Sequence, residues 1–446
     1  MAEDPPGRIE HSSYIYRFTE NIRYTHMAMI ERLPNNRLVS VWQAAPLPEN
    51  FNETDQRLAV EGLDQQHIMM SISKDDTGSR WLTPRKLPLQ NKASLWSPVP
   101  HLDQDGKLWL FYSESRLCKK AEPCHKCKLP PCPPIVEETE ICHTNPEAWV
   151  PGGDIKVTTS VGPLTDNVWT RARTIFSLEE GGSIPKVISN KVAVLSSGEW
   201  LLPMWREQAT SSLPANSCPR REEDLRSGCL HGEVTPCMSG TEESAGVLWS
   251  GDQGKTWRAF GEIVDPAGRT SLIEGSVAEL RNHSVFMVFR TTVGCLYSSV
   301  SHDKGRTWAE PQSMAVPNPN SKVHMISLKP GGELVLAFNN HRSANAYRGL
   351  KNCKACRSRM HLAISRDNGE TWEHSLSMDD ELSSSAVRIH YPCITQLGTD
   401  PRVVVVYTRF YLGRKLGLIS PDQGVVASAV DLSEALNRPM PEKNPL

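Results

Sequence analysis

The amino-acid sequence predicts an all-β protein, a six-bladed β-propeller, and three observations carry this prediction. One eight-residue pattern, Ser-x-Asp-x-Gly-x-Thr-Trp, occurs three times, at residues 250–257, 301–308 and 365–372. Six short apolar segments with the composition of β-strands are spaced along the chain, most of them after a turn-forming pair of residues. No long segment shows the apolar period of a helix.

The repeated pattern is expected to close β-hairpins. A strand-like segment precedes each copy, as residues 294–300 precede the second. The aspartate of the pattern can accept backbone N–H groups, the glycine can adopt positive φ, and the tryptophan can pack on the neighbouring sheet. Residues 73–81 form a fourth copy with one extra residue, and residues 160–169 resemble an eroded fifth. We therefore predict structural roles for the residues of the pattern rather than contacts with a substrate.

The six apolar segments are expected to be central strands of six four-stranded blades in a single domain, residues 1–446. Two stretches interrupt their order, a cysteine-rich one at about 118–150 and a polar one at about 209–243. We expect both to be loop insertions. The six predicted strands are Arg37–Trp42, Lys107–Tyr112, Trp200–Trp205, Ser284–Phe289, Glu333–Phe338 and Arg402–Tyr407.

Charge and hydropathy argue against two classes of partner. The formal net charge is −2, which offers no basic surface for a nucleic acid. The longest apolar run, Val403–Tyr407, is far shorter than a membrane-spanning helix. We therefore expect no nucleic-acid partner and no membrane span. The first residues lack the basic head and apolar core of a signal peptide, so a secreted form would have a trimmed or incomplete N-terminus here.

The twelve cysteines favour a secreted protein or one in the lumen of the secretory pathway. Most of them fall in three clusters, within residues 118–142, 218–237 and 353–356, whereas Cys295 and Cys393 stand apart. We expect the clustered cysteines to form disulfide bonds that stabilise the insertions.

Zinc binding is the alternative for two cysteine pairs. Cys124 with Cys127, and Cys353 with Cys356, have the spacing of zinc ligands. The segments between the pairs are rich in proline and lack the regular spacing of zinc fingers, so we favour disulfides and predict no metal site. Two N-glycosylation sequons, one of them Asn282-His-Ser and the other at residues 52–54, agree with secretion.

The repeated pattern is that of the Asp box of the sialidase (neuraminidase) superfamily, which the chain resembles over nearly its whole length. The resemblance implies a propeller that hydrolyses a terminal acidic sugar, such as a sialic acid, from a glycan and that needs no cofactor. Such enzymes hold the sugar carboxylate with three arginines and use a tyrosine nucleophile, a glutamate that activates it and a carboxyl acid/base. Guanidinium groups bind a carboxylate bidentately, and a neutral phenol avoids the repulsion that a carboxylate nucleophile would suffer.

The resemblance implies roles for individual residues. Glu274, which begins the segment Glu-Gly-Ser-Val-Ala-Glu-Leu, looks like the glutamate that activates the tyrosine. Arg290 ends the next predicted strand ahead of an Asp box, as the second triad arginine does. Arg357 precedes the third box and resembles the third triad arginine, with Arg359 as the alternative. Tyr391, in the segment His-Tyr-Pro-Cys-Ile-Thr-Gln, resembles the nucleophile.

The chain departs from the family pattern at the first triad arginine, where Thr25 or His26 stands. In this it resembles a divergent branch of Asp-box propellers whose opening strand carries a histidine. A protonated histidine can bind a carboxylate, and a histidine can act as a general acid, so His26 is a candidate site residue. Glu61 and Asp64, on the segment before the fourth copy of the pattern, are the two candidates for the acid/base.

The missing arginine leaves alternatives open. The substrate could be another uronic or neutral terminal sugar, or the chain could be a propeller that binds glycans without catalysis. A structural interaction propeller is a third possibility, since an arginine at a strand end is usually a surface group and a tyrosine in a strand is usually core. The catalytic hypothesis requires Glu274, Arg290, Arg357 and Tyr391 to meet near the propeller axis on one face.

Overall fold

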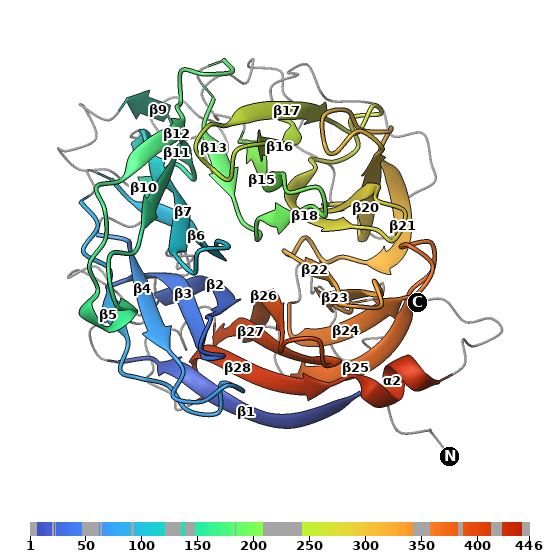
Figure 1. The fold of residues 1–446 in the computed structure, drawn as a ribbon. Helices are drawn as coiled ribbons and strands as arrows, with labels where there is room; N and C mark the ends of the chain where they lie inside the picture. The colour runs from blue at the N-terminus through green and yellow to red at the C-terminus, as the bar shows by residue number, and fades with distance from the viewer. Residues whose placement is uncertain are drawn as a thin grey trace, which may run out of the picture.

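The computed structural model is built of β-sheets arranged in a ring about a central axis (Figure 1). The chain passes once around this ring, from the blue N-terminal strands to the red C-terminal strands. The all-β prediction is confirmed. The structure describes residues 7–19, 22, 24–46, 62, 65–90, 93–120, 135–138, 148–182, 184–207, 243–341, 357–381, 387–411 and 422–438.

Four sheets have four strands each, in which every neighbouring pair with printed register is antiparallel. In three of them the strands follow chain order, and in the fourth the order is β26–β27–β28–β1. Their strands are β2 (Tyr24–Arg32), β3 (Leu38–Ala45), β4 (His67–Ile72) and β5 (Arg85–Lys86); β18 (Ile273–Glu279), β19 (Val285–Arg290), β20 (Cys295–Ser301) and β21 (Gln312–Pro317); β22 (His324–Ser327), β23 (Leu334–Asn339), β24 (Arg359–Ser365) and β25 (Glu373–Asp380); and β26 (Val387–Gln396), β27 (Arg402–Tyr411), β28 (Gly424–Asp431) and β1 (Arg8–Arg17).

A nine-stranded sheet occupies the remaining arc of the ring. A single residue pair, Gly153 with Lys186, joins its two halves. One half contains β6 (Leu95–Leu102), β7 (Leu108–Ser115), β11 (Gly153–Thr159) and β12 (Arg173–Phe176), and the other contains β13 (Lys186–Ile188), β14 (Ala193–Val194), β15 (Trp200–Arg206), β16 (Ala245–Ser250) and β17 (Arg258–Ile263).

Smaller elements lie beside these sheets. A three-stranded sheet is formed by β8 (Leu117–Lys120), β9 (Ile135–Glu138) and β10 (Ala148–Trp149). Within the described residues the helical elements are a 3-10 turn at Leu164–Asp166 and α2 (Ser433–Asn437). The described part of the cysteine-rich stretch thus contains short strands, which differs from a plain loop. Residues 209–242 lie outside the described residues, so the second predicted insertion stays a prediction.

The N-terminal strand β1 closes the ring by pairing with the C-terminal strand β28, from Arg8 opposite Asp431 to Arg17 opposite Gly424. Figure 1 shows the blue β1 running alongside the red β28. This pairing uses the N–H and C=O groups that β28 would otherwise expose at an edge. The two ends of the described chain are therefore held in one sheet.

Each of the six predicted central strands is a strand of the structure, namely β3, β7, β15, β19, β23 and β27. Each is the second strand outward from the ring's centre, between an inner strand and the rest of its sheet. Their apolar runs reflect this position, because side chains on both faces pack against neighbouring sheets. In β27, for example, Val403–Val406 are completely buried.

The repeated pattern forms tight turns after β16, β20 and β24, as its residue types predict. In the first copy Asp252 accepts hydrogen bonds from the backbone N–H of Thr256 at 2.9 Å and from its hydroxyl at 2.6 Å. Trp257 Nε1 donates to the carbonyl of Gly254 at 3.1 Å, and Gly254 has φ +81°. The carboxylate therefore holds the turn closed while the indole covers it.

The fourth and fifth copies also form closed turns, in which the serine at the start pairs with the tryptophan at the end. A β-bridge joins Ser73 to Trp81, and another joins Ser160 to Trp169. Among the described residues, no helix is long and apolar enough to cross a membrane.

We predict that Asp252→Ala lowers the free energy of unfolding by about 1 kcal/mol, because the turn loses its charge-assisted hydrogen bonds. These bonds hold the pKa of Asp252 down to about 2 against the effect of burial. Their stabilisation is therefore present at neutral pH and is lost as pH falls from about 4 toward about 2. Urea unfolding at pH 7 and at pH 3 measures both effects, with the exposed Lys255→Ala as the control in the same turn. If Asp252→Ala lost the same free energy of unfolding at pH 7 and at pH 3, the ionised Asp252 carboxylate would not be what stabilises the turn.

Candidate active site

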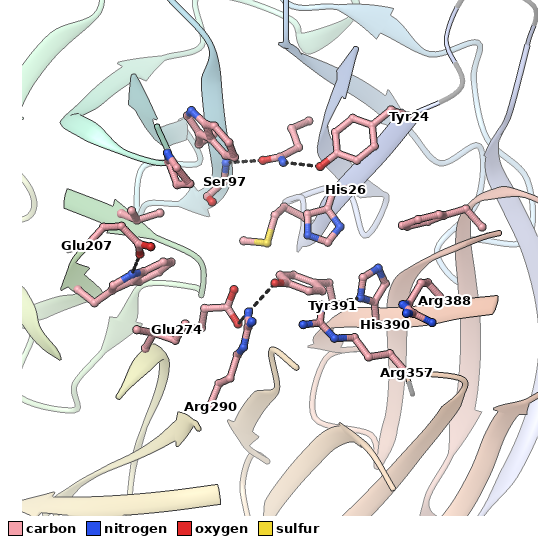
Figure 2. Close-up of a pocket in the computed structure, with 18 residues that line it drawn as sticks. Tyr24, His26, Ser97, Glu207, Glu274, Arg290, Arg357, Arg388, His390 and Tyr391 are labelled. Carbon is pink, nitrogen blue, oxygen red and sulfur yellow. Dashed lines mark hydrogen bonds and ion pairs between the residues drawn. The ribbon is translucent and has the colours of Figure 1, made fainter. Parts of the chain in front are cut away.

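A pocket of about 360 Å³ is lined by residues of several sheets, largely from their inner strands (Figure 2). Its wall carries an unusual density of titratable groups. They are Tyr24, His26, Glu207, Glu274, Arg290, Arg357, Arg388, His390 and Tyr391.

Four residues that line the pocket have left-handed backbone conformations. Met27, Ser97, Glu274 and Tyr391 have φ of 54°, 51°, 52° and 58°. Each lies at a register shift in the pairing of an inner strand with its neighbour: β2, β6, β18 and β26. A bulge of this kind turns a side chain out of the strand's alternation. Because a non-glycine residue in this conformation costs about 1–2 kcal/mol, the surrounding structure must hold each bulge in place.

Buried amide side chains supply that support for two of the bulges. Gln43 on β3 accepts a hydrogen bond from the backbone N–H of Ser97 at 2.9 Å and donates to the hydroxyl of Tyr24 at 3.1 Å. Asn190, just after β13, donates to the carbonyl of Glu274 at 2.9 Å and to that of Gly275 at 3.0 Å. In both cases the supporting side chain comes from the sheet that precedes the bulge in the chain.

A buried lysine supports the bulge at Tyr391 in the same way. Lys322, which precedes β22 and is completely buried, donates from Nζ to the carbonyl of Pro392 at 2.6 Å. Burial lowers the pKa of Lys322 to about 8. Asn339 on β23 adds a hydrogen bond to the carbonyl of Ile389 at 2.8 Å. The backbone on both sides of Tyr391 is thus fixed by the preceding sheet.

Arg290 links Tyr391 to Glu274. Its Nη1 donates to the hydroxyl of Tyr391 at 2.6 Å and forms an ion pair with Glu274 Oε2 at 2.9 Å. Its Nε donates to the side chain of Asn320 at 2.7 Å, which fixes the guanidinium plane. Figure 2 shows the tyrosine hydroxyl and the glutamate carboxylate directed toward the same guanidinium. A positive charge at this place stabilises a phenolate, and a carboxylate close by can take up the phenol's proton.

Arg357 and Arg388 stand side by side at another part of the wall. Their backbones form a β-bridge between the segment before β24 and strand β26. Arg357 donates to His390 Nδ1 at 3.3 Å and to the carbonyl of Asn320. Burial, together with the charge of Arg357, lowers the pKa of Arg388 to about 10. Two neighbouring guanidinium groups repel each other, and an anion placed between them would relieve that repulsion.

Histidine rings pack around Tyr391. The ring centroids of His26 and Tyr391 lie 3.9 Å apart, and those of His390 and Tyr391 lie 4.7 Å apart. Burial, and after it the neighbouring arginines such as Arg357, hold the pKa of His390 well below 6.5. His390 is therefore neutral near pH 7, and it can accept the hydrogen bond from Arg357.

Glu207, one residue beyond β15, is the second carboxyl group of the pocket among the described residues. Trp205 Nε1 donates to its Oε2 at 2.5 Å. Withdrawal from water raises the pKa of Glu207 to about 7, with Glu243 and Glu274 adding to the effect and the Trp205 hydrogen bond and Arg290 opposing it. A fraction of Glu207 is therefore protonated at neutral pH.

Comparisons with known proteins agree with the fold and the repeats. Residues 59–405 match the family of BNR repeat-like domains. The chain belongs to this family. Among curated proteins, none matches the chain in sequence.

Solved structures place this BNR-repeat chain among sialidase-like folds. A Dyadobacter fermentans protein of unknown function aligns with 96% of the chain and 100% of its own length, at 16% identity and a TM-score of 0.63. The leech intramolecular trans-sialidase aligns over 96% of the chain and 70% of its own, at 13% identity and a TM-score of 0.60. The NanB sialidase of Streptococcus pneumoniae aligns over 95% and 71%, at 13% identity and a TM-score of 0.59. At these identities the likeness concerns the fold alone, which this chain shares with sialidases.

The structure brings most of the predicted site residues of this BNR-repeat chain together. His26, Glu274, Arg290, Arg357 and Tyr391 all line the one pocket. The alternative arginine, at position 359, is not among the lining residues, and it forms an ion pair with a carboxylate of β25 at 3.3 Å instead.

Two predicted acid/base residues, Glu61 and Asp64, lie outside the described residues. Two residues of the pocket, Glu207 and Arg388, were not predicted, because they lack a motif of their own. The one signal for Arg388 was its position shortly before Tyr391 on a predicted strand. Among the described residues, no cluster of histidine, cysteine, aspartate or glutamate could hold a metal ion. The cysteine pairs with zinc-ligand spacing lie outside those residues.

We predict that Asn190→Ala lowers the free energy of unfolding by about 2 kcal/mol, because two buried carbonyls lose their donor. The same change releases the bulge at Glu274 and should weaken whatever the pocket binds. The control is Ser189→Ala, since the buried Ser189 hydroxyl has no hydrogen-bond partner in the described part of the chain. Urea unfolding compares the two variants, and an unchanged midpoint for Asn190→Ala would show that the bulge needs no such support.

Proposed function

We propose that this protein is a glycoside hydrolase that removes a terminal acidic sugar, sialic-acid-like in the first instance, from a glycan. The observation that carries the proposal is the bridge from Arg290 to both Tyr391 and Glu274 inside a pocket. A core tyrosine does not need a charged group at its hydroxyl, whereas a tyrosine nucleophile does. The sialidase-like fold supports the same class of reaction, and the leech neighbour is complexed with 2,7-anhydro-Neu5Ac.

Three arginines are available to hold the sugar's carboxylate. Arg290, Arg357 and Arg388 line the pocket, and the guanidinium carbons of Arg290 and Arg357 lie 6.0 Å and 5.6 Å from the ring centroid of Tyr391. In this proposal Arg388 compensates for the missing first arginine of the family pattern, and His26 contributes from above the tyrosine ring. Guanidinium groups suit this task because they offer paired donors to a carboxylate.

The proposed mechanism has two steps and retains the anomeric configuration. Tyr391 attacks the anomeric carbon while Glu274 takes the phenol's proton and Arg290 stabilises the developing negative charge. A carboxyl acid, for which the sequence offers Glu61 or Asp64, protonates the leaving oxygen. Water then displaces the tyrosine and releases the sugar.

Other functions are alternatives to this proposal. Because the first triad arginine is absent, a different uronic or neutral terminal sugar is an alternative substrate. A glycan-binding module would need the pocket but not the nucleophile. A purely structural propeller is less favoured, because Arg290 and Arg357 face a common pocket rather than separate salt bridges on the surface.

Several finer expectations belong to the same proposal. We infer six blades, because the nine-stranded sheet divides into two blade-like halves at the pair of Gly153 and Lys186. Disulfide bonds within the cysteine clusters and a secretory location also remain part of it. Cys393, which stands apart from the clusters, is a buried free thiol among the described cysteines.

We predict that wild-type protein releases free sugar from a panel of sialylated and uronic-acid-capped glycans, as detected by mass spectrometry. Tyr391→Phe should reduce that release by at least about a thousandfold, because the variant lacks the nucleophilic oxygen. The affinity for the glycan should change little. Glycan binding by both the wild type and Tyr391→Phe, without any turnover by the wild type, would favour the glycan-binding module.

We predict that Arg388→Met weakens binding of an acidic sugar about 10- to 100-fold, the value of charge-assisted hydrogen bonds to a carboxylate. Binding of the matching sugar with an esterified carboxylate should be much less affected. The exposed Arg258→Met, on β17 and away from the pocket, serves as the control. Equal weakening for the acid and the ester would remove Arg388 from carboxylate recognition.

A further inference from the structure

The geometry points to Glu207 as a catalytic residue, the acid that protonates the leaving oxygen. This inference rests on the proposed function and assigns the proton donor that the sequence left between Glu61 and Asp64. Its basis is the place of Glu207 in the pocket wall and the partners that surround its carboxyl group.

The position of Glu207 suits an acid that faces a tyrosine nucleophile. A general acid must reach the leaving oxygen, which departs from the side of the anomeric carbon opposite to the attacking atom. Figure 2 shows Glu207 on the wall across from Tyr391 and His26, with Glu274 and Arg290 between them. All of these residues line the same 360 Å³ pocket, so a single sugar ring can contact both walls.

The two described carboxyl groups of the pocket have different surroundings. Glu274 forms an ion pair with Arg290, which suits an ionised base. Glu207 accepts a hydrogen bond from the neutral indole of Trp205 and stands within electrostatic range of Glu243 and Glu274, which both favour its protonated form. Arg290 opposes them. A carboxyl group paired with a guanidinium and one placed beside other carboxylates suit the roles of base and acid, respectively.

Glu207, Tyr391 and Glu274 together account for every proton that moves in the proposed reaction. In the first step the bond between the anomeric carbon and the leaving oxygen breaks, the oxygen takes the proton of Glu207, and the Tyr391 oxygen bonds to the anomeric carbon as its proton passes to Glu274. In the second step Glu207 takes a proton from water, the water oxygen bonds to the anomeric carbon, and the bond between that carbon and the Tyr391 oxygen breaks, which leaves a phenolate. Tyr391 then recovers its proton from Glu274.

The test compares two leaving groups on the wild type and on Glu207→Gln. The first probe is sialyllactose, whose sugar leaving group needs a proton from an acid. The second is the 4-nitrophenyl glycoside of N-acetylneuraminic acid, whose leaving group, 4-nitrophenolate, departs without protonation. We expect Glu207→Gln to lose about 10²- to 10⁴-fold in kcat/KM on sialyllactose and at least about tenfold less than that on the nitrophenyl probe. The exposed Glu262→Gln serves as the matched control.

The pH profile gives a second readout that a merely structural role would not move. With the wild type, kcat/KM on sialyllactose should fall as pH rises through about 7, the pKa of Glu207, because the acid must carry its proton. Trp205→Phe removes a hydrogen bond that lowers this pKa and should move the fall to higher pH. Glu243→Gln removes a charge that raises it and should move the fall to lower pH.

Each outcome decides between the assignments. Equal losses of Glu207→Gln on both probes, or a leaving-group-dependent loss in Glu61→Gln or Asp64→Asn instead, would overturn the role of Glu207 and leave the hydrolase proposal standing. No release by the wild type from either probe would overturn the proposed function, and the assignment of Glu207 with it. A selective loss together with opposite pH displacements in the two neighbour variants would support Glu207.

Discussion

The pocket depends on left-handed bulges in the inner strands of the ring. At Met27, Ser97, Glu274 and Tyr391 the backbone leaves regular strand geometry and brings a side chain to the pocket wall. An L-residue adopts this conformation at a cost, so it persists only where neighbouring groups fix it. Three of the bulges are fixed by buried hydrogen bonds from the preceding sheet, so the site is built across the joints between sheets rather than within any one of them.

This arrangement couples the stability of the ring to the geometry of the site. Asn190, Gln43 and Lys322 each join two sheets, and each contacts backbone within one residue of a residue in the pocket wall. Each of these side chains has a donor or acceptor that pairs with a carbonyl or N–H group that the bulges leave without a ladder partner, which offsets part of the cost of burial. Pairing of β1 with β28 completes the same ring, so the wall is held on all sides by sheets of one chain.

The charges of the pocket are arranged in two regions. Arg290 stands with Glu274 at the hydroxyl of Tyr391, while Arg357 and Arg388 lie side by side with neutral His390. The first region can move a proton and stabilise a phenolate, and the second attracts an anion. The Asp-box turns, by contrast, lie outside the pocket and stabilise hairpins, so the feature that reveals the family does not perform its chemistry.

The sequence by itself determined the strands, the turns and most of the candidate site. Its turn pairs and apolar runs located all six central strands, because strand formation follows from local side-chain pattern. The family resemblance placed Glu274, Arg290, Arg357 and Tyr391, since each keeps a fixed offset from a recognisable segment.

Tertiary structure decided what depends on contacts between distant segments. Glu207 acquires its protonated character only when folding withdraws it from water beside other carboxylates, and Arg388 becomes a pocket residue only when β26 lies beside the segment before β24. The support of Glu274 comes from Asn190, 84 residues earlier in the chain. No local pattern records such pairs, because burial and electrostatic environment are properties of the packed sheets and not of the residues that enter them.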